Sequence, residues 1–288
     1  MTKISLSVII VSYKQADIVL DCISSIYQYN DIGEQLEIIL VDNSPTHNVY
    51  HAVVEEFATV HAIKNNNTGF GAGNNLGAAK ATGEYILFLN PDTILVESIF
   101  KFAINKFEIN SNLSMFGLKL VSKKLKRNAS FYLMDGGGIF RNILIKLCNI
   151  CDVYIDGFMY ISGANLFIKR NDFIQCGQFD KNIFMYYEEP DLTMRLHELG
   201  KSTNYYNDKK IIHLEGGTSS DSELALRRRL DSALYFYRKI HKNPTKLFVR
   251  ELRLDKLKYA IYKITGSNKI TQTSININIL SEYIATNK

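Results

Sequence analysis

Carboxylates at two places along the chain are the side chains best suited to chemistry. The first is Asp92 in the sequence Asn90-Pro91-Asp92, where it could bind a divalent cation or simply belong to a turn. The second place is the cluster Glu188-Glu189-Pro190-Asp191, and a carboxylate within reach of a substrate hydroxyl can accept its proton. Pro190 favours the first turn of a helix, so these acids could instead interact only with the helix dipole.

Two further positions could bind a ligand. Asp42-Asn43 follows the apolar run Leu36–Val41 and is followed by Ser-Pro, a composition that also suits an Asx turn. His213 follows two isoleucines and lies shortly before a Gly-Gly turn. A neutral imidazole could complete the shell of Mn²⁺ or contact a phosphate, although a lone histidine is more often structural.

The first hundred residues alternate between apolar runs typical of buried strands and segments with helical spacing. Continuous apolar strands separated by helices predict a parallel sheet covered on both faces. Such sheets bind ligands beyond the carboxyl ends of their strands, which is where the polar residues after positions 11, 41 and 89 fall. We expect strands at Leu6–Val11, Leu36–Val41, Val60–Ile63 and Tyr85–Leu89, and helices at Ala16–Tyr27, residues 49–57 and Ala78–Ala81.

Residues 111–215 are less regular. Phe158–Ile168 resembles a buried strand interrupted at Ser162-Gly163, a helix is expected after the acidic cluster, and Ile211–His213 predicts another short strand. From Asp221 the pattern is helical and basic, with twelve Lys or Arg against three Asp or Glu between residues 227 and 263. We therefore divide the chain at residues 110 and 220.

Several familiar motifs are incomplete. The glycine-rich stretch Asn65–Gly77 departs from the dinucleotide-binding fingerprint, because Leu76 stands where the third glycine is required. Gly200-Lys201-Ser202 lacks the leading glycine of a phosphate-binding loop. Cys148 and Cys151 form a lone pair, two ligands short of a structural zinc site.

Composition places the chain among ordinary globular proteins. It has 288 residues, 46% of them hydrophobic and 22% charged, with a formal net charge of +5. No run approaches the roughly 18 apolar residues of a transmembrane helix, and the N-terminus reads as a strand, not as a signal peptide. Four cysteines are too few for a disulfide scaffold, so the expected setting is a reducing cytoplasm. Without a stacking motif or base-reading module, nucleic acid is not an expected partner.

The motifs together resemble those of the inverting GT-A glycosyltransferases of family 2, and within them the rhamnosyltransferase-like bacterial enzymes. They appear in the family's order, cover about residues 5–240, and predict an α/β fold with a mostly parallel, mixed sheet flanked by helices and a helical C-terminal extension. The matching segments are Ser7–Tyr13, Val41–Ser44, Asn67–Asn75, Leu89–Thr93, Ser162–Ala164, Phe179-Asp180, Tyr187–Leu192, and His213 with Gly216–Thr218.

The resemblance implies transfer of a sugar, with inversion, from a UDP- or dTDP-sugar to a saccharide or lipid-linked saccharide in bacterial surface polysaccharide synthesis. The rhamnosyltransferase-like matches favour dTDP-rhamnose. Residues 1–110 would bind the nucleotide sugar, residues 111–220 would bind the acceptor and carry out catalysis, and residues 221–288 would form the basic helical extension. That extension could contact the inner face of the plasma membrane, mediate a homodimer, or be a solvated helical face.

The resemblance also implies a site for Mg²⁺ or Mn²⁺ formed by Asp92 and His213. The family's usual Asp-x-Asp motif is Asn90-Pro91-Asp92 here, so only one carboxylate is offered to the cation. Asn90 would offer a neutral oxygen to the ribose or to a metal-bound water. The family's base position falls on Glu189, where the family usually has Asp; Asp191 is the close rival and Glu188 a third.

For the nucleotide, Asp42 matches the position that binds the pyrimidine base. Its carboxylate would accept the ring N3–H of uracil or thymine and would reject cytosine. Gly163 and Ala164 match the region of the donor or acceptor sugar. Five further positions match nucleotide-binding residues, with a plain helix-entry loop as the alternative for the last two: Ser12, Tyr13, Asn43, Gly73 and Asn75.

Two other functions are compatible with this fold. A nucleotidyltransferase would usually carry a glycine-rich, basic loop after the first strand, but residues 12–15 are Ser-Tyr-Lys-Gln. A non-catalytic binding module with a degenerate GT-A fold is the second alternative, because Asn90 replaces a carboxylate of the metal motif.

Overall fold

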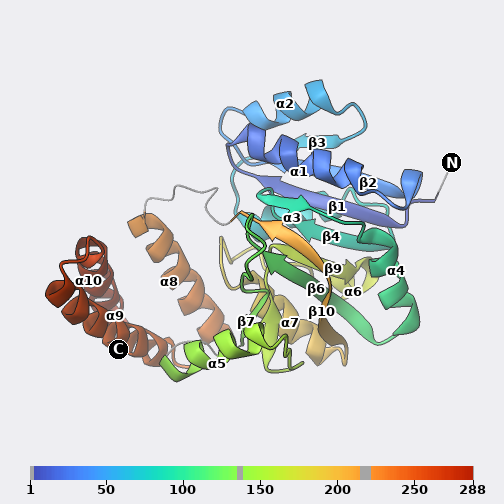
Figure 1. Ribbon diagram of the computed structural model, residues 1–288. Helices are drawn as coiled ribbons and strands as arrows, with labels where there is room; N and C mark the ends of the chain where they lie inside the picture. Colours follow the sequence, from blue (N-terminus) through green and yellow to red (C-terminus); the bar gives the residue numbers. More distant parts are fainter. Residues whose placement is uncertain (1–2, 135–138, 215–221, 288) are drawn as a thin grey trace.

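The computed structural model describes residues 3–134, 139–214 and 222–287 and is built around a mixed, mostly parallel sheet (Figure 1). The eight strands are β1 (Leu6–Ser12), β2 (Leu36–Asp42), β3 (His61–Lys64), β4 (Tyr85–Leu89), β5 (Thr93–Leu95), β6 (Leu113–Val121), β9 (Asn165–Lys169) and β10 (Ser202–His213). They lie in the order β3-β2-β1-β4-β9-β6-β10-β5. β9 is antiparallel to β4 and β6, and β5 is antiparallel to β10. The predicted fold class is confirmed.

Helices cover both faces of this sheet because its strands are apolar on both sides. On β1, Val8 and Ile10 face one core and Ile9 faces the other. The first core is closed by α1 (Ala16–Gln28), α2 (Asn48–Glu56) and α4 (Phe100–Ile109), and a short 3-10 turn, η1 (Gly33–Gln35), precedes β2. The second core is closed by α3 (Phe70–Ala78), α6 (Arg170–Gln175) and α7 (Glu188–Glu198).

The expected helix at Ala78–Ala81 was wrong, because the glycine-rich stretch before it is itself the helix. α3 begins at Phe70 and ends at Ala78. A Cβ added to Gly77 would lie 2.5 Å from Ile9 Cγ2, and one on Gly73 would lie 2.9 Å from Val11 Cγ1. The glycines therefore let α3 lie directly against β1, and this close packing offsets their low helix propensity.

The second half adds strands to the same sheet. The interruption predicted at Ser162-Gly163 is present, since β8 (Met159–Ile161) ends before it and β9 begins after it. β8 pairs with β7 (Phe131–Leu133) in a separate two-stranded sheet, and α5 (Ile139–Ile150) follows β7 in the chain. β10 is much longer than the predicted Ile211–His213. The prediction missed its first part because those residues are mostly half-buried or exposed and give a weak apolar signal. The Gly216–Thr218 motif lies outside the described residues.

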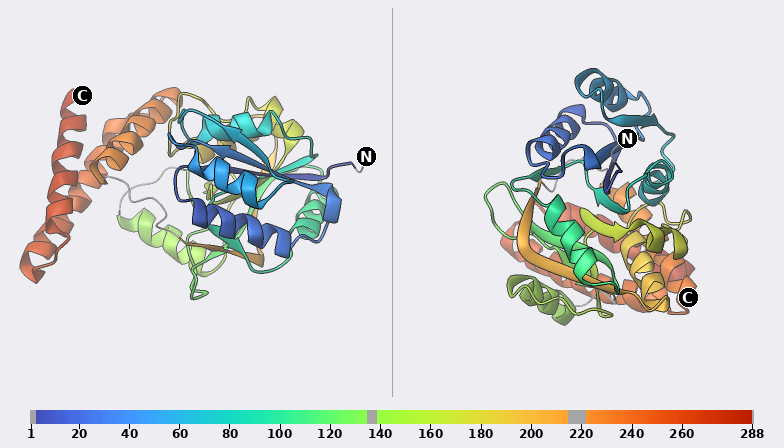
Figure 2. Two further views of the ribbon diagram at one scale, coloured as in Figure 1. Left: turned by 90° about the horizontal axis from the view of Figure 1, so that it is seen from above. Right: turned by 90° about the vertical axis from the view of Figure 1, so that its right-hand side faces the viewer.

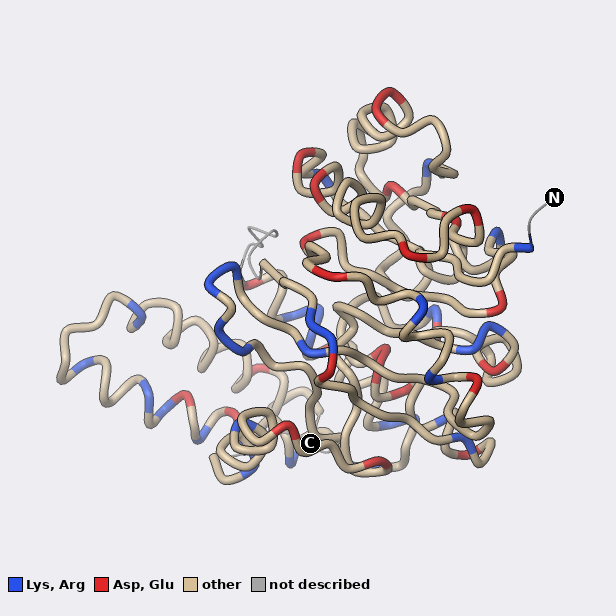
Figure 3. The backbone as a smooth tube through the Cα atoms, turned by 45° about the vertical axis from the view of Figure 1, so that its right-hand side comes forward, with Lys and Arg blue, Asp and Glu red and all other residues tan. Residues whose placement is uncertain are grey.

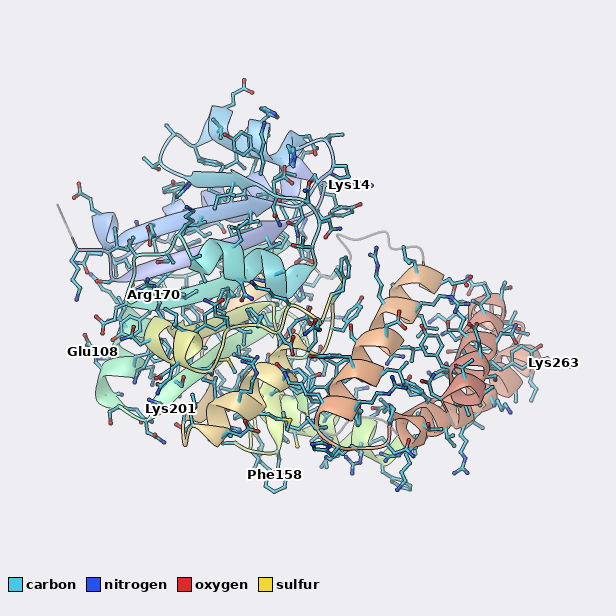
Figure 4. All side chains as sticks on the ribbon, turned by 180° about the vertical axis from the view of Figure 1, so that it is seen from behind. Lys14, Glu108, Phe158, Arg170, Lys201 and Lys263 are labelled. Atoms are coloured by element: carbon cyan, nitrogen blue, oxygen red, sulfur yellow. The ribbon has the colours of Figure 1, made fainter. Side chains whose placement is uncertain are left out.

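Three helices form the C-terminal region, to one side of the sheet (Figure 2). They are α8 (Ser222–Lys239), α9 (Pro244–Thr265) and α10 (Ile270–Thr286), and they share a core that includes Leu230, Phe236, Phe248 and Leu280. Lys263, near the end of α9, lies far from the sheet (Figure 4). Among the residues described, no helix is both long and apolar enough to span a membrane.

Candidate active site

The carboxyl ends of the central strands bring the expected polar residues to one edge of the sheet. Ser12 of β1 is paired in register with Asp42 of β2, and Asn43 N donates to Ser12 O at 2.9 Å. Just beyond β4, the backbone N–H of Asn90 donates to Ala164 O at 3.1 Å. Segments more than seventy residues apart in the sequence therefore meet at this edge.

Asp92 and His213 form a pair that suits a divalent cation. β5 and β10 place His213 opposite Thr93, and Leu214 N donates to Asp92 O at 2.9 Å. As a result Oδ1 of Asp92 lies 3.3 Å from Nε2 of His213, with the two side chains 16% and 15% exposed. A carboxylate oxygen and an imidazole nitrogen are both common ligands of such cations. No group of three His, Cys, Asp or Glu suited to a metal occurs in the described part of the chain.

Glu189 is held by the backbone that links β8 to β9. Its Oε1 accepts a hydrogen bond from Gly163 N at 3.1 Å. A Cβ on residue 163 would lie 2.2 Å from that same oxygen, so only glycine leaves room for the carboxylate here. Burial raises the pKa of Glu189 above its ordinary value. A raised pKa brings a carboxylate closer to the range useful for accepting a proton at neutral pH.

Glu188, its neighbour, is more deeply buried. Its side chain is 1% exposed, and Oε1 has no hydrogen-bond partner among the described residues. Burial, and after it the charge of Glu189, hold the pKa of Glu188 well above its ordinary value. The protein environment therefore favours the proton-bound form of Glu188 over its ionised form, compared with an exposed glutamate.

Asp191 is engaged in ion pairs through both oxygens. Oδ2 accepts from Arg195 Nε at 2.9 Å and from its Nη2 at 2.6 Å, and Oδ1 lies 2.6 Å from Lys239 Nζ. The side chain of Asp191 is only 3% exposed. Both oxygens of Asp191 therefore already face cationic side chains, and these contacts tie α7 to α8. The geometry therefore favours Glu189 over Asp191 as the base.

A turn with left-handed backbone conformation precedes Glu188, Glu189 and Asp191. Tyr186 and Tyr187, just before α7, have φ values of 69° and 73°. Non-glycine residues in this region cost on the order of 1–3 kcal/mol each and are found where surrounding contacts hold them. The acidic cluster does begin a helix, as predicted from Pro190, since α7 starts at Glu188.

Asp42 has structural contacts for both of its carboxylate oxygens. It is fully buried, and Oδ1 accepts from Ser44 N while Oδ2 accepts from Tyr50 N, each at 2.8 Å. The first contact is the Asx turn considered from the sequence, and the second ties β2 to α2. Each oxygen therefore has a structural backbone partner and one further acceptor site, and the pyrimidine contact stays a prediction.

Of the other expected nucleotide-binding residues, some are exposed to solvent and others are hydrogen-bonded within the protein. Tyr13 is 42% exposed at the end of β1. Ser12 and Asn43 are buried, and Asn43 Oδ1 accepts from Asn65 Nδ2 at 2.8 Å. Asn75 bonds to the backbone of Phe179 in both directions, at 2.8 and 3.0 Å, which fixes α3 against the segment before α7.

A tyrosine pair beside the acidic cluster was missed from the sequence. Tyr132 of β7 and Tyr160 of β8 are cross-strand partners, with ring centroids 5.6 Å apart and planes at 30°. β8 packs against α7, and burial, followed by the charge of Glu189, raises the pKa of Tyr160 well above its ordinary value. Tyr132 is 39% exposed. Two aromatic residues 28 positions apart carry no local pattern that would have indicated this pair.

Comparisons with known proteins identify a glycosyltransferase domain in the chain. Residues 7–110 match the family model described as glycosyl transferase family 2. Rhamnosyltransferase WbbL of Escherichia coli is 26% identical in an alignment 223 residues long, which covers 72% of this chain and 82% of that protein. An uncharacterized glycosyltransferase of Bacillus subtilis, YfnE, is 22% identical over 254 residues, 73% of this chain and 64% of that protein.

Solved structures support the fold. The mannosyltransferase PcManGT of Pyrobaculum calidifontis, in complex with GDP-Man and Mn²⁺, superposes with a TM-score of 0.61 at 14% identity, over 98% of this chain and 81% of that one. GalNAc-T7 with UDP, GalNAc and Mn²⁺ superposes with a TM-score of 0.58 at 14% identity, over 78% of this chain and 47% of that one. The chain is therefore a rhamnosyltransferase-like glycosyltransferase with the GT-A fold and a family 2 domain at residues 7–110.

Proposed function

We propose that the protein transfers a sugar, with inversion, from a nucleoside diphosphate sugar to a hydroxyl of a saccharide or lipid-linked saccharide, with Glu189 as the base. The observation that carries this proposal is the contrast between two neighbouring carboxylates. Glu189 accepts a hydrogen bond from the backbone N–H of Gly163, whereas Asp191 is bonded to two cations. Glu189 is therefore the better placed of the two carboxylates to meet an acceptor hydroxyl.

In this mechanism the acceptor hydroxyl lies beside Glu189. As its oxygen forms a bond to the anomeric carbon, its proton passes to the Glu189 carboxylate and the bond from that carbon to the diphosphate oxygen breaks. Attack from the face opposite the leaving group inverts the configuration. The Gly163 N–H orients the carboxylate, and burial, which raises the pKa of Glu188, disfavours a second negative charge beside the base. The exposed ring of Tyr132 offers an apolar face to the acceptor sugar.

Asp92 and His213 would hold the cation, Mg²⁺ or Mn²⁺. A bound divalent cation neutralises charge on a leaving diphosphate. Two solved structures with the same fold contain Mn²⁺ together with GDP-Man or with UDP and GalNAc, which supports a metal and a nucleotide sugar as partners for this chain. The similarity to a rhamnosyltransferase supports rhamnose, carried by dTDP or UDP, as the donor sugar.

A lipid-linked acceptor would also need contact with a membrane surface. Lys and Arg positions are distributed along the C-terminal helices (Figure 3). On α9, the exposed residues at helical spacing are both basic and apolar: Arg253, Lys256, Leu257 and Ile261. Such a face suits an anionic bilayer. Sedimentation with anionic and with neutral vesicles tests this contact; absence of binding to both would contradict it.

The test of the proposed function is release of nucleoside diphosphate from a panel of nucleotide sugars, measured with and without saccharide acceptors. We expect release that depends on acceptor, divalent cation and Glu189. Nucleotide binding without any turnover, for every donor, would instead support the non-catalytic binding module.

A further inference from the structure

Helix α8 packs along residues 180–187, the segment that leads into α7. Ser232 Oγ donates to Met185 O at 2.8 Å. The Arg228 guanidinium lies over the ring of Phe184, 4.6 Å from its centroid. The C-terminal region is therefore in direct contact with the segment that leads into the acidic cluster at the start of α7.

The same helix holds the strained residue at the start of α7. The ring of Tyr187 lies 5.3 Å from that of Phe236 and 6.1 Å from that of Tyr237. Contacts that fix this ring also stabilise the left-handed backbone of Tyr187, which that residue would not adopt at no cost. Because Glu188 and Glu189 follow directly, the turn sets the direction in which both carboxylates point.

Lys239, the last residue of α8, ties the two ends of this turn together. Its Nζ lies 2.7 Å from Asp180 Oδ2 and 2.6 Å from Asp191 Oδ1. Tyr235 OH donates to the same Asp180 oxygen at 2.9 Å. Asp180 precedes the turn and Asp191 lies in the first turn of α7, so a single ammonium group connects both sides of it. These carboxylates have side chains 14% and 3% exposed, so their ion pairs with Lys239 are shielded from water.

We propose that α8 positions the catalytic base, and that Lys239 is its main positioning residue. Lys239 acts through Asp180 and Asp191 on the backbone turn that aims Glu189. This inference rests on the proposed function, in which Glu189 is the base. It makes the C-terminal region part of the catalytic architecture instead of an appendage used only for attachment.

Loss of Lys239 would also change the charge around the base. Asp180 would lose its cation and Asp191 would keep only Arg195, which leaves uncompensated negative charge near Glu189 and disfavours its ionised form. A merely structural role would not move the pH dependence of turnover. The titratable groups that face this region come from several elements: Glu188, Asp191 and Arg195 of α7, Asp180 and Tyr187 before it, Tyr235 and Tyr237 of α8, and Tyr160 of β8.

The experiment compares Lys239→Met, Lys239→Arg and Lys242→Met with the wild type in the full chain. Lys242 is exposed three residues further on and serves as the matched control. We measure kcat and the donor KM across pH by diphosphate release, with rates normalised to the folded fraction from thermal unfolding. For Lys239→Met we expect kcat to fall by about ten- to a hundredfold, the cost of a misplaced catalytic group, with the donor KM unchanged. The acidic limb of its pH profile moves to higher pH, Lys239→Arg restores most of the activity, and Lys242→Met behaves as wild type.

Two milder variants keep the proposal testable if Lys239→Met does not fold. Tyr235→Phe and Ser232→Ala each remove one hydroxyl from the contact between α8 and the turn, and each should lower kcat without changing the donor KM. Wild-type kcat in both, or a folded Lys239→Met with wild-type kcat and an unmoved acidic limb, would overturn the proposal. Glu189→Gln distinguishes failure of the proposed base from failure of the positioning role. If Glu189→Gln has wild-type turnover, Glu189 is not the base. If Glu189→Gln is inactive while Lys239→Met has wild-type turnover, only the role of α8 fails.

Discussion

Replacing Glu189 by Gln keeps the shape of the side chain and removes its ability to accept a proton. The amide oxygen can still accept the hydrogen bond from Gly163 N that the carboxylate accepts at 3.1 Å, so the fold should be retained. A positioned general base contributes about two to four orders of magnitude to the rate. We therefore expect kcat to fall by that factor, which corresponds to about 2.7–5.4 kcal/mol of transition-state stabilisation.

Asp191→Asn is the comparison that gives this result its meaning. This change breaks two ion pairs of a side chain that is 3% exposed, and breaking a buried pair costs about 3–5 kcal/mol of folding stability. In a domain of this size each kcal/mol lowers the melting temperature by about 2–4 °C. We expect Asp191→Asn to lower the melting temperature clearly, and to lower turnover per folded molecule much less than Glu189→Gln does.

The assay is diphosphate release at saturating donor, combined with calorimetric titration of the donor nucleotide and thermal unfolding of each variant. Donor affinity should be unchanged in Glu189→Gln, because the base faces the acceptor. If Asp191→Asn is inactive while still folded and Glu189→Gln turns over normally, the assignment of the base is refuted. If neither change affects turnover, the base lies elsewhere.

Further predictions concern the metal, the buried acid, the glycine and the turn. Chelation by EDTA should abolish turnover, and Asp92→Ala should lower kcat by at least about a hundredfold, or about 2.7 kcal/mol, which full activity in EDTA would contradict. The pKa of Glu188 is raised above its ordinary 4.5, so the folded state holds this proton more tightly than the unfolded chain does. Folding stability is therefore lost as pH rises from about 4.5 toward the raised pKa. Glu188→Gln should therefore raise the melting temperature at pH 7 and leave it unchanged at pH 4; equal shifts at both pH values would refute this. Gly163→Ala should displace Glu189, since the new Cβ would lie 2.2 Å from Oε1, and kinetics should show a lower kcat at unchanged donor KM. Asp42→Ala leaves two backbone N–H groups unpaired, at about 1–3 kcal/mol each, so calorimetry should find a much lower melting temperature as its main effect.

Local patterns predicted the strands that are mostly apolar and mostly buried. These are β1, β2 and β4, and their predicted bounds agree with the structure within one residue. α3 was not predicted as a helix, because its three glycines and two asparagines form a helix here only through their packing on β1 and their contacts with distant backbone. The first part of β10 was missed because its polar residues alternate with a few buried ones, a pattern without a strong apolar signal.

The candidate site was predictable where a residue follows directly from a strand end. Asp92 and His213 both lie at such ends, and the antiparallel pairing of β5 with β10 brings them together. The environment of a carboxylate was not predictable in the same way. Asp191 is bonded to Lys239, 48 residues further along the chain, and no local spacing encodes such a contact. The same limitation applies to Asp42, whose turn-forming contacts were considered from the sequence but whose bond to α2 required the structure.

Mass spectrometry of the acceptor tests the central claim most directly. The wild-type protein and Glu189→Gln are incubated with UDP- and dTDP-sugars, dTDP-rhamnose among them, together with saccharide and lipid-linked saccharide acceptors and Mn²⁺ or Mg²⁺. We predict that one donor adds a single sugar residue to one acceptor in the presence of the wild type, and that this product is lost with Glu189→Gln. An acceptor whose mass stays unchanged with every donor, while the protein still binds nucleotide, would contradict the account.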